Sequence, residues 1–240
     1  MPTATATVTS EALLANSTSI LSLKAPKPVA AESSTAATLR SLYPRAAKAF
    51  LQRDFALTYS LLTSAFALVG PPTFAAEDEL ASLRRKWDIL RITLEVTVYT
   101  SPPSPDIANA YPAALRNNQT MSPSSLLNSL YTRSVQLFTP VTSTQSGNSA
   151  YLPCSILCTL VSAGVKLGCS EISRGIIEDW LARRAPDDSE EGRKGYAKVL
   201  ELYCLHVLSR LEEWQYAEDF LLYERELDAE LRNVSANQRP

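Results

Sequence analysis

The side chains in this chain that could carry chemistry are few, and the most suggestive are four cysteines and a single histidine. Cys154 and Cys158 are one helical turn apart, so both thiols can share a helix face, with Cys204 or His206 completing a metal site. Structural zinc sites usually use the shorter C-x-x-C spacing, which is missing here, and thiols buried in a reducing compartment are the simpler interpretation. We therefore predict no metal site and no cofactor.

Catalysis by hydrolysis or group transfer needs a nucleophile with a base, or paired acids in a cleft. His206 lies between apolar neighbours in a predicted helix, which favours a packed or half-exposed side chain over a general base. Acidic residues gather at 187–191 and 224–230, where they are typical of solvated faces or loops. An all-α enzyme of the terpenoid or hydrolase type is another possible class of function, but the D-D-x-x-D spacing of an Asp-rich metal motif is missing. The pattern predicts a protein that is not an enzyme.

The composition indicates a globular protein with no general attraction for nucleic acid. The 240 residues are 45% hydrophobic and 20% charged, with a net charge of -2. Basic runs at 84–86, 183–184 and 193–194 are short and lack the interleaved aromatics of a nucleic-acid groove. The run at 84–86 is either a solvated helix face or a contact for an acidic protein. Seven glycines and no phosphate-binding loop argue against a nucleotide enzyme.

Targeting and membrane-spanning signals are missing from the sequence as given. Residues 1–10 contain no Lys or Arg, so they lack the charged start of a secretory signal. No apolar run approaches the roughly 20 residues that span a bilayer. We expect the chain as given to be soluble.

Apolar residues at helical spacing predict helices throughout the folded part. We expect a first helix from Leu39 with Pro44 in its first turn, a corner at 53–55, and a second helix closed at 70–72. Acids at 77–79 are expected in the first turn of a helix that ends near Tyr99. An irregular connection at 100–125 contains one short helix at 106–116. Ser122 and Pro123 begin the next helix, and a flexible loop follows at 139–151.

Two further hairpins are predicted between 152 and about Arg232. Gly168 ends one helix, Ser170 caps the next, and an acidic loop at 187–191 leads to a final hairpin that turns at 212–213. The apolar stripe of the helix that Ser170 caps consists of Ile172, Ile176, Ile177, Trp180 and Leu181. The two stripes of the final hairpin are Tyr196, Val199, Leu200, Tyr203, Val207 and Leu211, and Trp214, Ala217, Phe220, Leu221, Leu227 and Leu231.

The fold class that follows is all-α, with antiparallel helical hairpins in a tetratricopeptide-like or 14-3-3-like array. Residues 1–38 are expected to be a disordered Ser/Thr/Ala/Pro-rich arm, 39–232 the helical domain, and 233–240 a polar tail. Such helices cannot bury their stripes alone, as in helical repeats. The pattern favours a scaffold that holds other proteins.

Three stretches of this pattern carry a resemblance to a known family. They are 46–66, with L-Q-R-D-F-A-L at the corner; 152–168, opening L-P-C-S-I-L-C and followed by I-I-E-D-W-L at 176–181; and 196–221, with L-E-L-Y-C-L-H-V-L and W-x-x-A-E. In these the chain resembles the soluble domain of the tail-anchored peroxins, the family of mammalian peroxin twenty-six and yeast peroxin fifteen. Members of that family end in a transmembrane helix, and we expect no segment of the sequence as given to form one.

The resemblance implies an adaptor on the cytosolic face of the peroxisomal membrane. Its partner would be the N-terminal domains of the heterohexameric peroxisomal AAA-ATPase, which extracts and recycles the import receptor, itself a further partner. A membrane attachment would come only through a C-terminal anchor outside this chain. The other interpretation is a generic α-solenoid adaptor, for instance in tail-anchored protein delivery or mitochondrial division.

The partner-binding residues that we predict lie in the first two hairpins. Gln52, Arg53, Asp54 and Phe55 match the family's first-hairpin turn, and Arg84 and Arg85 lie on the next helix. Phe55 has two interpretations, a core residue or an interface residue.

Overall fold

The described part of the chain is built from helices. The computed structural model describes residues 34–75, 78–102, 111–144, 147–187, 189–224 and 226. Its α-helices are α1 (Ser34–Leu51), α2 (Phe55–Phe66), α3 (Ala81–Thr100), α5 (Ala113–Thr120), α6 (Pro123–Phe138), α7 (Cys154–Lys166), α8 (Ser170–Arg183), α9 (Glu190–Glu201) and α10 (Trp214–Tyr223). A 3-10 helix, η1 (Ser149–Tyr151), precedes α7, and a π-helix, η2 (Leu202–Leu208), continues α9. The predicted all-α fold is confirmed for these residues.

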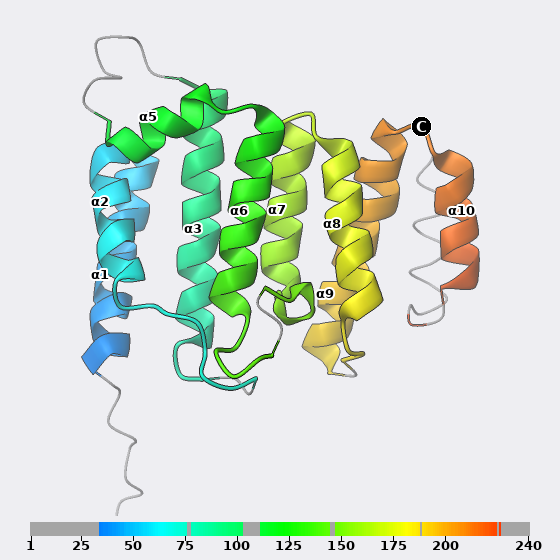
Figure 1. Cartoon of the computed structure of the whole chain (residues 1–240), viewed down its shortest axis with the longest axis horizontal. Helices are drawn as coiled ribbons and strands as arrows, with labels where there is room; N and C mark the ends of the chain where they lie inside the picture. The colour runs from blue at the N-terminus through cyan, green and yellow to red at the C-terminus, as the bar shows by residue number, and fades with distance from the viewer. Residues whose placement is uncertain are drawn as a thin grey trace, which may run out of the picture. The chain divides into compact units, whose positions relative to one another are not determined.

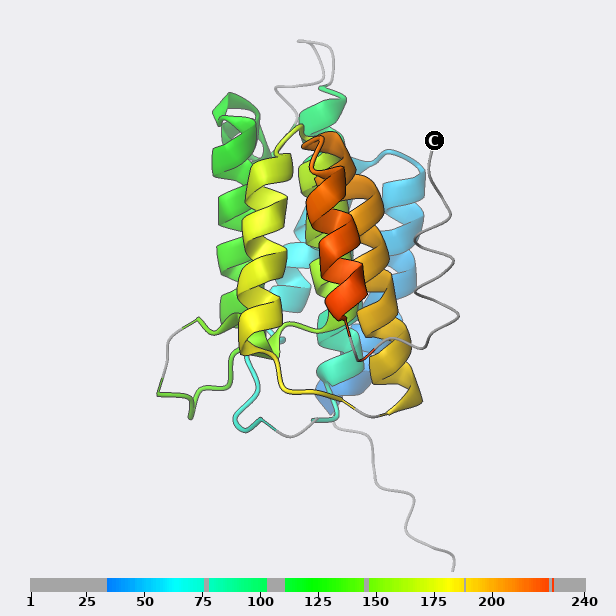
Figure 2. The ribbon, with the colours of Figure 1, turned by 90° about the vertical axis from the view of Figure 1, so that its right-hand side faces the viewer.

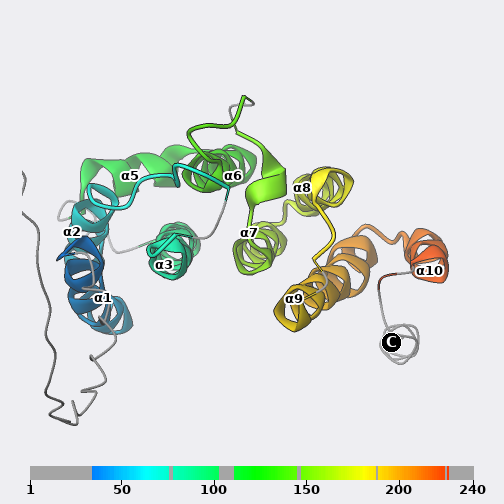
Figure 3. The same cartoon turned by 90° about the horizontal axis from the view of Figure 1, so that it is seen from below.

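The helices of residues 34–224 lie side by side in two rows (Figure 1, Figure 3). One row contains α1, α3, α7 and α9, and the other contains α2, α6, α8 and α10. Consecutive helices α1 and α2 pack together, as do α7 and α8, and η2 and α10. Contacts along the first row join α1 to α3, α3 to α7, and α7 to α9. The chain therefore stacks helical hairpins, and α5 lies in the connection between α3 and α6.

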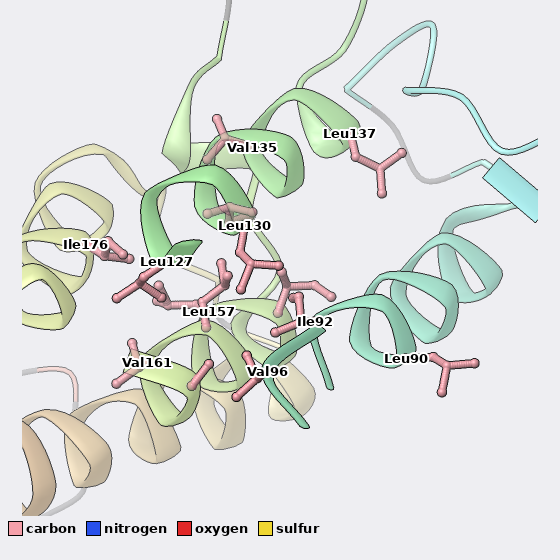
Figure 4. Packing of buried hydrophobic residues seen from close by; sticks show 14 of the residues in the cluster. Leu90, Ile92, Val96, Leu127, Leu130, Val135, Leu137, Leu157, Val161 and Ile176 are labelled. Carbon is pink, nitrogen blue, oxygen red and sulfur yellow. The ribbon is translucent and has the colours of Figure 1, made fainter. Parts of the chain in front are cut away.

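The hydrophobic core runs between the rows and is continuous from one hairpin to the next. Figure 4 shows its middle, where side chains of α3, α6, α7 and α8 meet. The buried residues labelled there are Leu90, Ile92, Val96, Leu127, Leu130, Val135, Leu137, Leu157, Val161 and Ile176. Because each helix contributes to a core shared with its neighbours, no hairpin buries its apolar stripe alone.

Three turns between paired helices have the same backbone geometry. Each contains one residue with positive φ, namely Arg53 (61°), Gly168 (73°) and Glu212 (61°). In each turn the amide of the residue after the left-handed one donates to the carbonyl five residues before it, in the preceding helix. The pairs are Asp54 to Ala49, Cys169 to Gly164, and Glu213 to Leu208. This hydrogen bond around a left-handed residue is the Schellman ending of a helix. The hairpins α1–α2, α7–α8 and η2–α10 are therefore structurally equivalent units.

Small buried residues occur at the same place in these three units. Thr58, Ser173 and Ala217 each lie five residues after the left-handed residue and are 0%, 0% and 6% exposed. In α7–α8 this position allows a close approach, because a Cβ on Gly164 would lie 2.0 Å from the Ser173 Oγ. A small residue at this position thus sets the crossing of the two helices.

The N-terminal helix is longer than predicted. It begins at Ser34, so residues 34–38 belong to α1 and not to a disordered arm, and Ala36 is fully buried. Pro44 lies inside α1 and not in its first turn, where its missing N–H interrupts the hydrogen-bond ladder. The predicted arm at 1–33 lies outside the described residues.

Several other boundaries differ from the prediction. Asp78 and Glu79 precede α3 instead of forming its first turn, and Asp78 binds Arg84 of that helix, while Glu77 lies outside the described residues. The short helix of the connection is α5, at 113–120, and not 106–116, of which 106–110 lie outside the described residues. Cys169, not Ser170, occupies the N-cap of α8. The acids Glu190 and Glu191 lie in the first turn of α9, which the Ser189 hydroxyl caps, and not in a loop.

In the final hairpin, the apolar stripe predicted for the first helix is largely buried, but the stripe predicted for the second is not. In α9 and η2 the predicted stripe is buried at Tyr196, Val199, Leu200, Tyr203 and Val207. In α10, which Figure 2 shows in front of η2, only Ala217 is buried, and Trp214 is 42% exposed. Leu227, Leu231 and the tail at 233–240 lie outside the described residues.

Candidate functional site

The six residues predicted to bind a partner fall into two groups at opposite ends of α2. Residues 52–54 form the turn before this helix and Phe55 begins it, whereas Arg84 donates to the Gly70 carbonyl just after it. With 12 residues in α2, the two groups are separated by about 18 Å of helix at 1.5 Å per residue. They therefore form two separate surfaces and not one patch.

The first group is the corner between α1 and α2. Gln52, Arg53 and Asp54 are exposed, as predicted. The Asp54 carboxylate also accepts the Leu57 amide at 3.0 Å, so it caps α2 and contributes to stability. Phe55 is 6% exposed and packs against the rings of Phe50 and Tyr111. Phe55 is therefore a core residue, and its burial contradicts the predicted interface role.

Arg84, in the second group, is a structural residue. Its side chain is 4% exposed, its Nε donates to the Gly70 carbonyl at 2.9 Å, and its two Nη atoms bind the Asp78 carboxylate at 3.1 and 2.7 Å. The guanidinium therefore holds the loop before α3 against that helix. The prediction of Arg84 as a partner contact is wrong, because its polar atoms are buried and used within the chain.

Arg85 instead lines a hollow that we call the foot groove. Its walls come from four segments: Pro72, Ala75, Asp78, Ala81, Arg84, Arg85, Phe138, Pro140, Tyr151 and Pro153. The hollow encloses about 130 Å³. It lies at the end of the array where the loop before α3 and the loop after α6 run together (Figure 1).

Backbone hydrogen bonds join the two loops beside the foot groove. The Val141 amide donates to the Pro72 carbonyl at 2.9 Å, and the Thr142 hydroxyl donates to the Thr73 carbonyl at 2.9 Å. Asn148 donates its amide to the Thr139 hydroxyl at 3.0 Å. The described parts of the loop predicted to be flexible are thus hydrogen-bonded to the loop before α3 and to the end of α6. The rim exposes apolar side chains, with Phe74 67% and Val141 69% exposed.

A second polar cluster, which the sequence did not reveal, is buried between α3 and α6. Glu95 is 2% exposed and accepts hydrogen bonds from Arg133 at 2.8 and 2.5 Å and from Asn118 at 2.7 Å. Asp88, fully buried, accepts the Ser134 hydroxyl at 2.8 Å. Burial raises the pKa of Asp88 despite its ion pairing. Each of these carboxylates has a partner, so the cluster joins α3 to α6.

The neighbouring ion pair completes this cluster. Arg91 lies 2.5 Å from Asp88, and its guanidinium also stacks over the Phe66 ring of α2 at 5.3 Å. Burial lowers the pKa of Arg91 and the Asp88 carboxylate partly restores it. Among the described residues, the Nε of Arg91 and the Nε1 of Trp87 are buried without a hydrogen-bond partner. The cluster thus connects α2, α3 and α6.

The C-terminal hairpins are joined by a third network. Arg174 of α8 binds Glu178 at 2.8 Å and Glu213 at 2.6 Å, and it lies over the Tyr216 ring. The Tyr203 hydroxyl donates to Glu178 at 2.7 Å. Burial raises the pKa of Glu178, but hydrogen bonds from Tyr203 and Arg174 outweigh this, so its pKa is lowered. This network fixes α10 against α8 and η2.

The cysteines and the histidine do not converge on a site. Cys154 and Cys158 are half-buried, and burial raises the pKa of Cys158 to about 11, so its thiol is protonated at neutral pH. Cys204 is 2% exposed, while His206 is exposed and not packed or half-exposed as expected. Within the described ranges no three His, Cys, Asp or Glu side chains are placed to hold a metal ion.

None of the described helices is both long enough and apolar enough to cross a membrane. Comparison of the chain with protein-family models, with curated proteins and with solved structures found no match.

Two residues that line the foot groove, Arg84 and Arg85, were predicted from the sequence as partner contacts, and none of the others was. Its apolar walls come largely from prolines and aromatics of the loops and helix ends, namely Pro72, Phe138, Pro140, Tyr151 and Pro153. A proline beside a predicted helix end was interpreted only as a boundary signal. Exposed apolar residues in both loops, such as Phe74 and Val141, were the signal available for an interaction surface.

Proposed function

We propose that this protein is an adaptor whose helical domain anchors the peroxisomal AAA-ATPase at the cytosolic face of the peroxisomal membrane. The observation that carries the proposal is the repeated hairpin unit. Three hairpins have the same left-handed turn, and the three stretches that resemble the tail-anchored peroxins cover these same hairpins. The resemblance therefore falls on recurring structural units and not on isolated patterns.

The repeated unit also supports a tetratricopeptide-like arrangement of the hairpins. In such arrays each unit contacts its neighbours, and stacked units present extended surfaces to other proteins. We expect the N-terminal domains of the ATPase heterohexamer to contact Gln52 and Arg53 at the exposed corner, with Asp54 holding that corner in shape. The import receptor is a further partner, and the membrane is reached through a C-terminal anchor outside this chain.

Binding of purified ATPase heterohexamer to the immobilised chain in the presence of ATP tests this proposal directly. We expect saturable binding that Arg53→Glu weakens, because reversing an exposed charge at an interface disturbs electrostatic complementarity. Arg193→Glu is the matched control, since Arg193 is equally exposed but lies on α9, far along the chain from the corner. Asp54 is unsuitable for this test because its loss would weaken the cap of α2.

Two results would count against the proposal in different ways. No binding of the heterohexamer to the unaltered chain would refute the peroxisomal function. Binding that Arg53→Glu and Arg193→Glu weaken equally would keep the function but remove the corner as its contact. Thermal unfolding of each variant verifies that neither substitution acts through stability.

A broader candidate is a generic α-solenoid adaptor, for example in delivery of tail-anchored proteins or in mitochondrial division. The equivalent turns favour it as well, because they describe a class of scaffold and not one partner. It predicts binding of a different protein and no affinity for the ATPase. The same binding experiment therefore separates the two candidates.

A further inference from the structure

We propose that the outer side of α1 is a docking surface for an acidic, amphipathic helix of a partner protein. This surface, which we call the α1 face, consists of Arg45, Lys48 and Leu51 of α1 with Gln52 and Arg53 of the turn that follows, all of them exposed. The inference rests on the proposed adaptor function only in taking a protein as the occupant. It extends the corner along the helix and names the chemistry of the partner.

The α1 face lies opposite the buried side of its helix. Ala46 and Ala49, which are 0% and 3% exposed, lie on the side that packs against α2 and α3. Arg45, Lys48 and Leu51 follow one another at intervals of three residues, so they are neighbours on the other side. They extend over about 9 Å of helix at 1.5 Å per residue. Figure 3 shows α1 and α2 at one end of the described array, where a helix of another protein can pack as a further unit would.

The cations of the α1 face have no ion-pair partner among the described residues. Arg45, Lys48 and Arg53 are all exposed and unpaired there. Residues 34–69 contain four cations and one acid, Asp54, whose carboxylate is engaged in capping α2. The chain as a whole has a net charge of -2, so the first hairpin is a local positive region in an acidic protein. Electrostatic complementarity therefore favours an acidic partner at this surface.

Leu51 supplies an apolar contact among these cations. Its side chain is 80% exposed, the largest fraction among the exposed large apolar side chains of the described residues. It lies between Lys48 and Arg53 in the chain, at the end of the helix. An exposed leucine flanked by unpaired cations matches a partner with an apolar stripe and acidic flanks, which is the pattern of an acidic amphipathic helix.

The α1 face is held in shape by contacts within the chain. The Asp54 amide donates to the Ala49 carbonyl at 3.0 Å around the left-handed Arg53. The Tyr43 ring of α1 meets the Trp87 ring of α3 edge-on, with centroids 5.3 Å apart. Binding then does not have to order α1, and the entropic cost of association is smaller for that reason.

Fluorescence anisotropy of labelled helical peptides with the full chain tests this inference. The probe is a fluorescein-labelled peptide of about 14 residues, roughly 21 Å of helix, with leucines on one stripe and glutamates on both flanks. In one control peptide glutamine replaces the glutamates, and in the other serine replaces the leucines. We expect binding of the acidic amphipathic peptide that weakens as salt is added, and binding of both controls that is at least about tenfold weaker.

Matched variants locate the site. Lys48→Glu is expected to weaken peptide binding by about tenfold, because it reverses a charge in the middle of the α1 face. Lys166→Glu, which changes an exposed lysine in the last turn of α7, is its control and should alter binding by less than about twofold. Leu51→Ser should also weaken binding by about tenfold, with Leu222→Ser at a 70% exposed leucine of α10 as its control.

Two results would overturn the α1 face as a docking surface. One is failure of the acidic amphipathic peptide to bind the unaltered chain. The other is an equal effect of Lys48→Glu and Lys166→Glu on its binding.

The ATPase measurement keeps this inference separate from the proposed function. Peptide binding that Lys48→Glu weakens, in a chain that does not bind the heterohexamer, would refute the peroxisomal function and retain the α1 face. Binding of the heterohexamer together with no peptide binding would retain the function and refute the α1 face.

Discussion

Two glycines of the α7–α8 hairpin should respond to the same substitution in opposite ways. Gly168 has a φ of 73° in the turn, whereas Gly175 lies inside α8. A Cβ added at either position meets no atom within 4 Å. Replacement by alanine therefore changes backbone energetics and not packing, which makes the pair a clean test of the repeated turn.

The expected magnitudes follow from the two conformations. An L-residue in the left-handed region costs about 1–2 kcal/mol, partly offset by the smaller conformational entropy of unfolded alanine. We expect Gly168→Ala to lower the free energy of unfolding by about 1 kcal/mol. Gly175→Ala should raise it by about 0.5–1 kcal/mol, because glycine in a helix interior is destabilising relative to alanine.

Guanidinium unfolding of the full chain, followed by circular dichroism, measures both effects. For a domain of this size, 1 kcal/mol corresponds to about 2–4 °C in Tm, so thermal unfolding provides a second readout. Equal midpoints for Gly168→Ala and the unaltered chain would refute the conclusion that Gly168 is held left-handed. A loss of stability in Gly175→Ala would refute its assignment to a regular helix with open space around it.

Three further predictions test other parts of the structure. Glu212→Gly should raise the free energy of unfolding by about 0.5–1 kcal/mol, because Glu212 holds the same left-handed turn at φ 61°; an unchanged denaturation midpoint would contradict the equivalence of the turns. Gly164→Ala should lower it by about 1–3 kcal/mol, because the new Cβ would lie 2.0 Å from Ser173 Oγ and 2.8 Å from Leu127 Cδ2; a neutral result in thermal unfolding would show that α7 and α8 are further apart. Glu178→Gln should lower the free energy of unfolding at pH 7, because the lowered pKa of Glu178 means that its ionised form stabilises the fold. This stabilisation is complete above pH 4.5, the ordinary pKa of the group, and is lost as the pH falls through the folded-state pKa, so the effect of the substitution should shrink at acidic pH. A difference in unfolding free energy that does not change with pH would exclude the hydrogen bonds from Tyr203 and Arg174 as its cause.

Local signals in the sequence predicted most helices, but not where the first one begins. Ser122 with Pro123, and Gly168, gave correct ends for α6 and α7 because capping depends on a few adjacent residues. The start of α1 did not follow from local chemistry. Its first turns are rich in Ser, Thr and Ala, and they are helical because Ala36 and Leu39 are buried in the core.

The candidate sites were harder to predict because they combine distant segments. Asp88, Arg91 and Glu95 have the three- and four-residue spacing of a solvated helix face, yet Asp88 and Glu95 are buried because α6 supplies Arg133 and Ser134. Arg84 and Arg85 are adjacent in sequence and both line the foot groove, but Arg84 is buried and bound to Asp78 whereas Arg85 is half-buried. Only the tertiary packing distinguishes them.

The exposure of α10 shows the same dependence on neighbours. Counted from the left-handed residue of each turn, Phe220 is equivalent to Leu61 in α2 and to Ile176 in α8. Leu61 and Ile176 are 7% and 5% exposed, whereas Phe220 is only partly buried. The apolar spacing is the same in all three helices, so the sequence pattern alone does not distinguish Phe220 from Leu61 and Ile176. Among the described residues α2 is covered by α3, the helix that follows it, and α8 is covered by η2, which continues α9. No described helix follows α10. In a stacked array the pattern of one helix determines which face is apolar, and the next unit determines whether that face is buried.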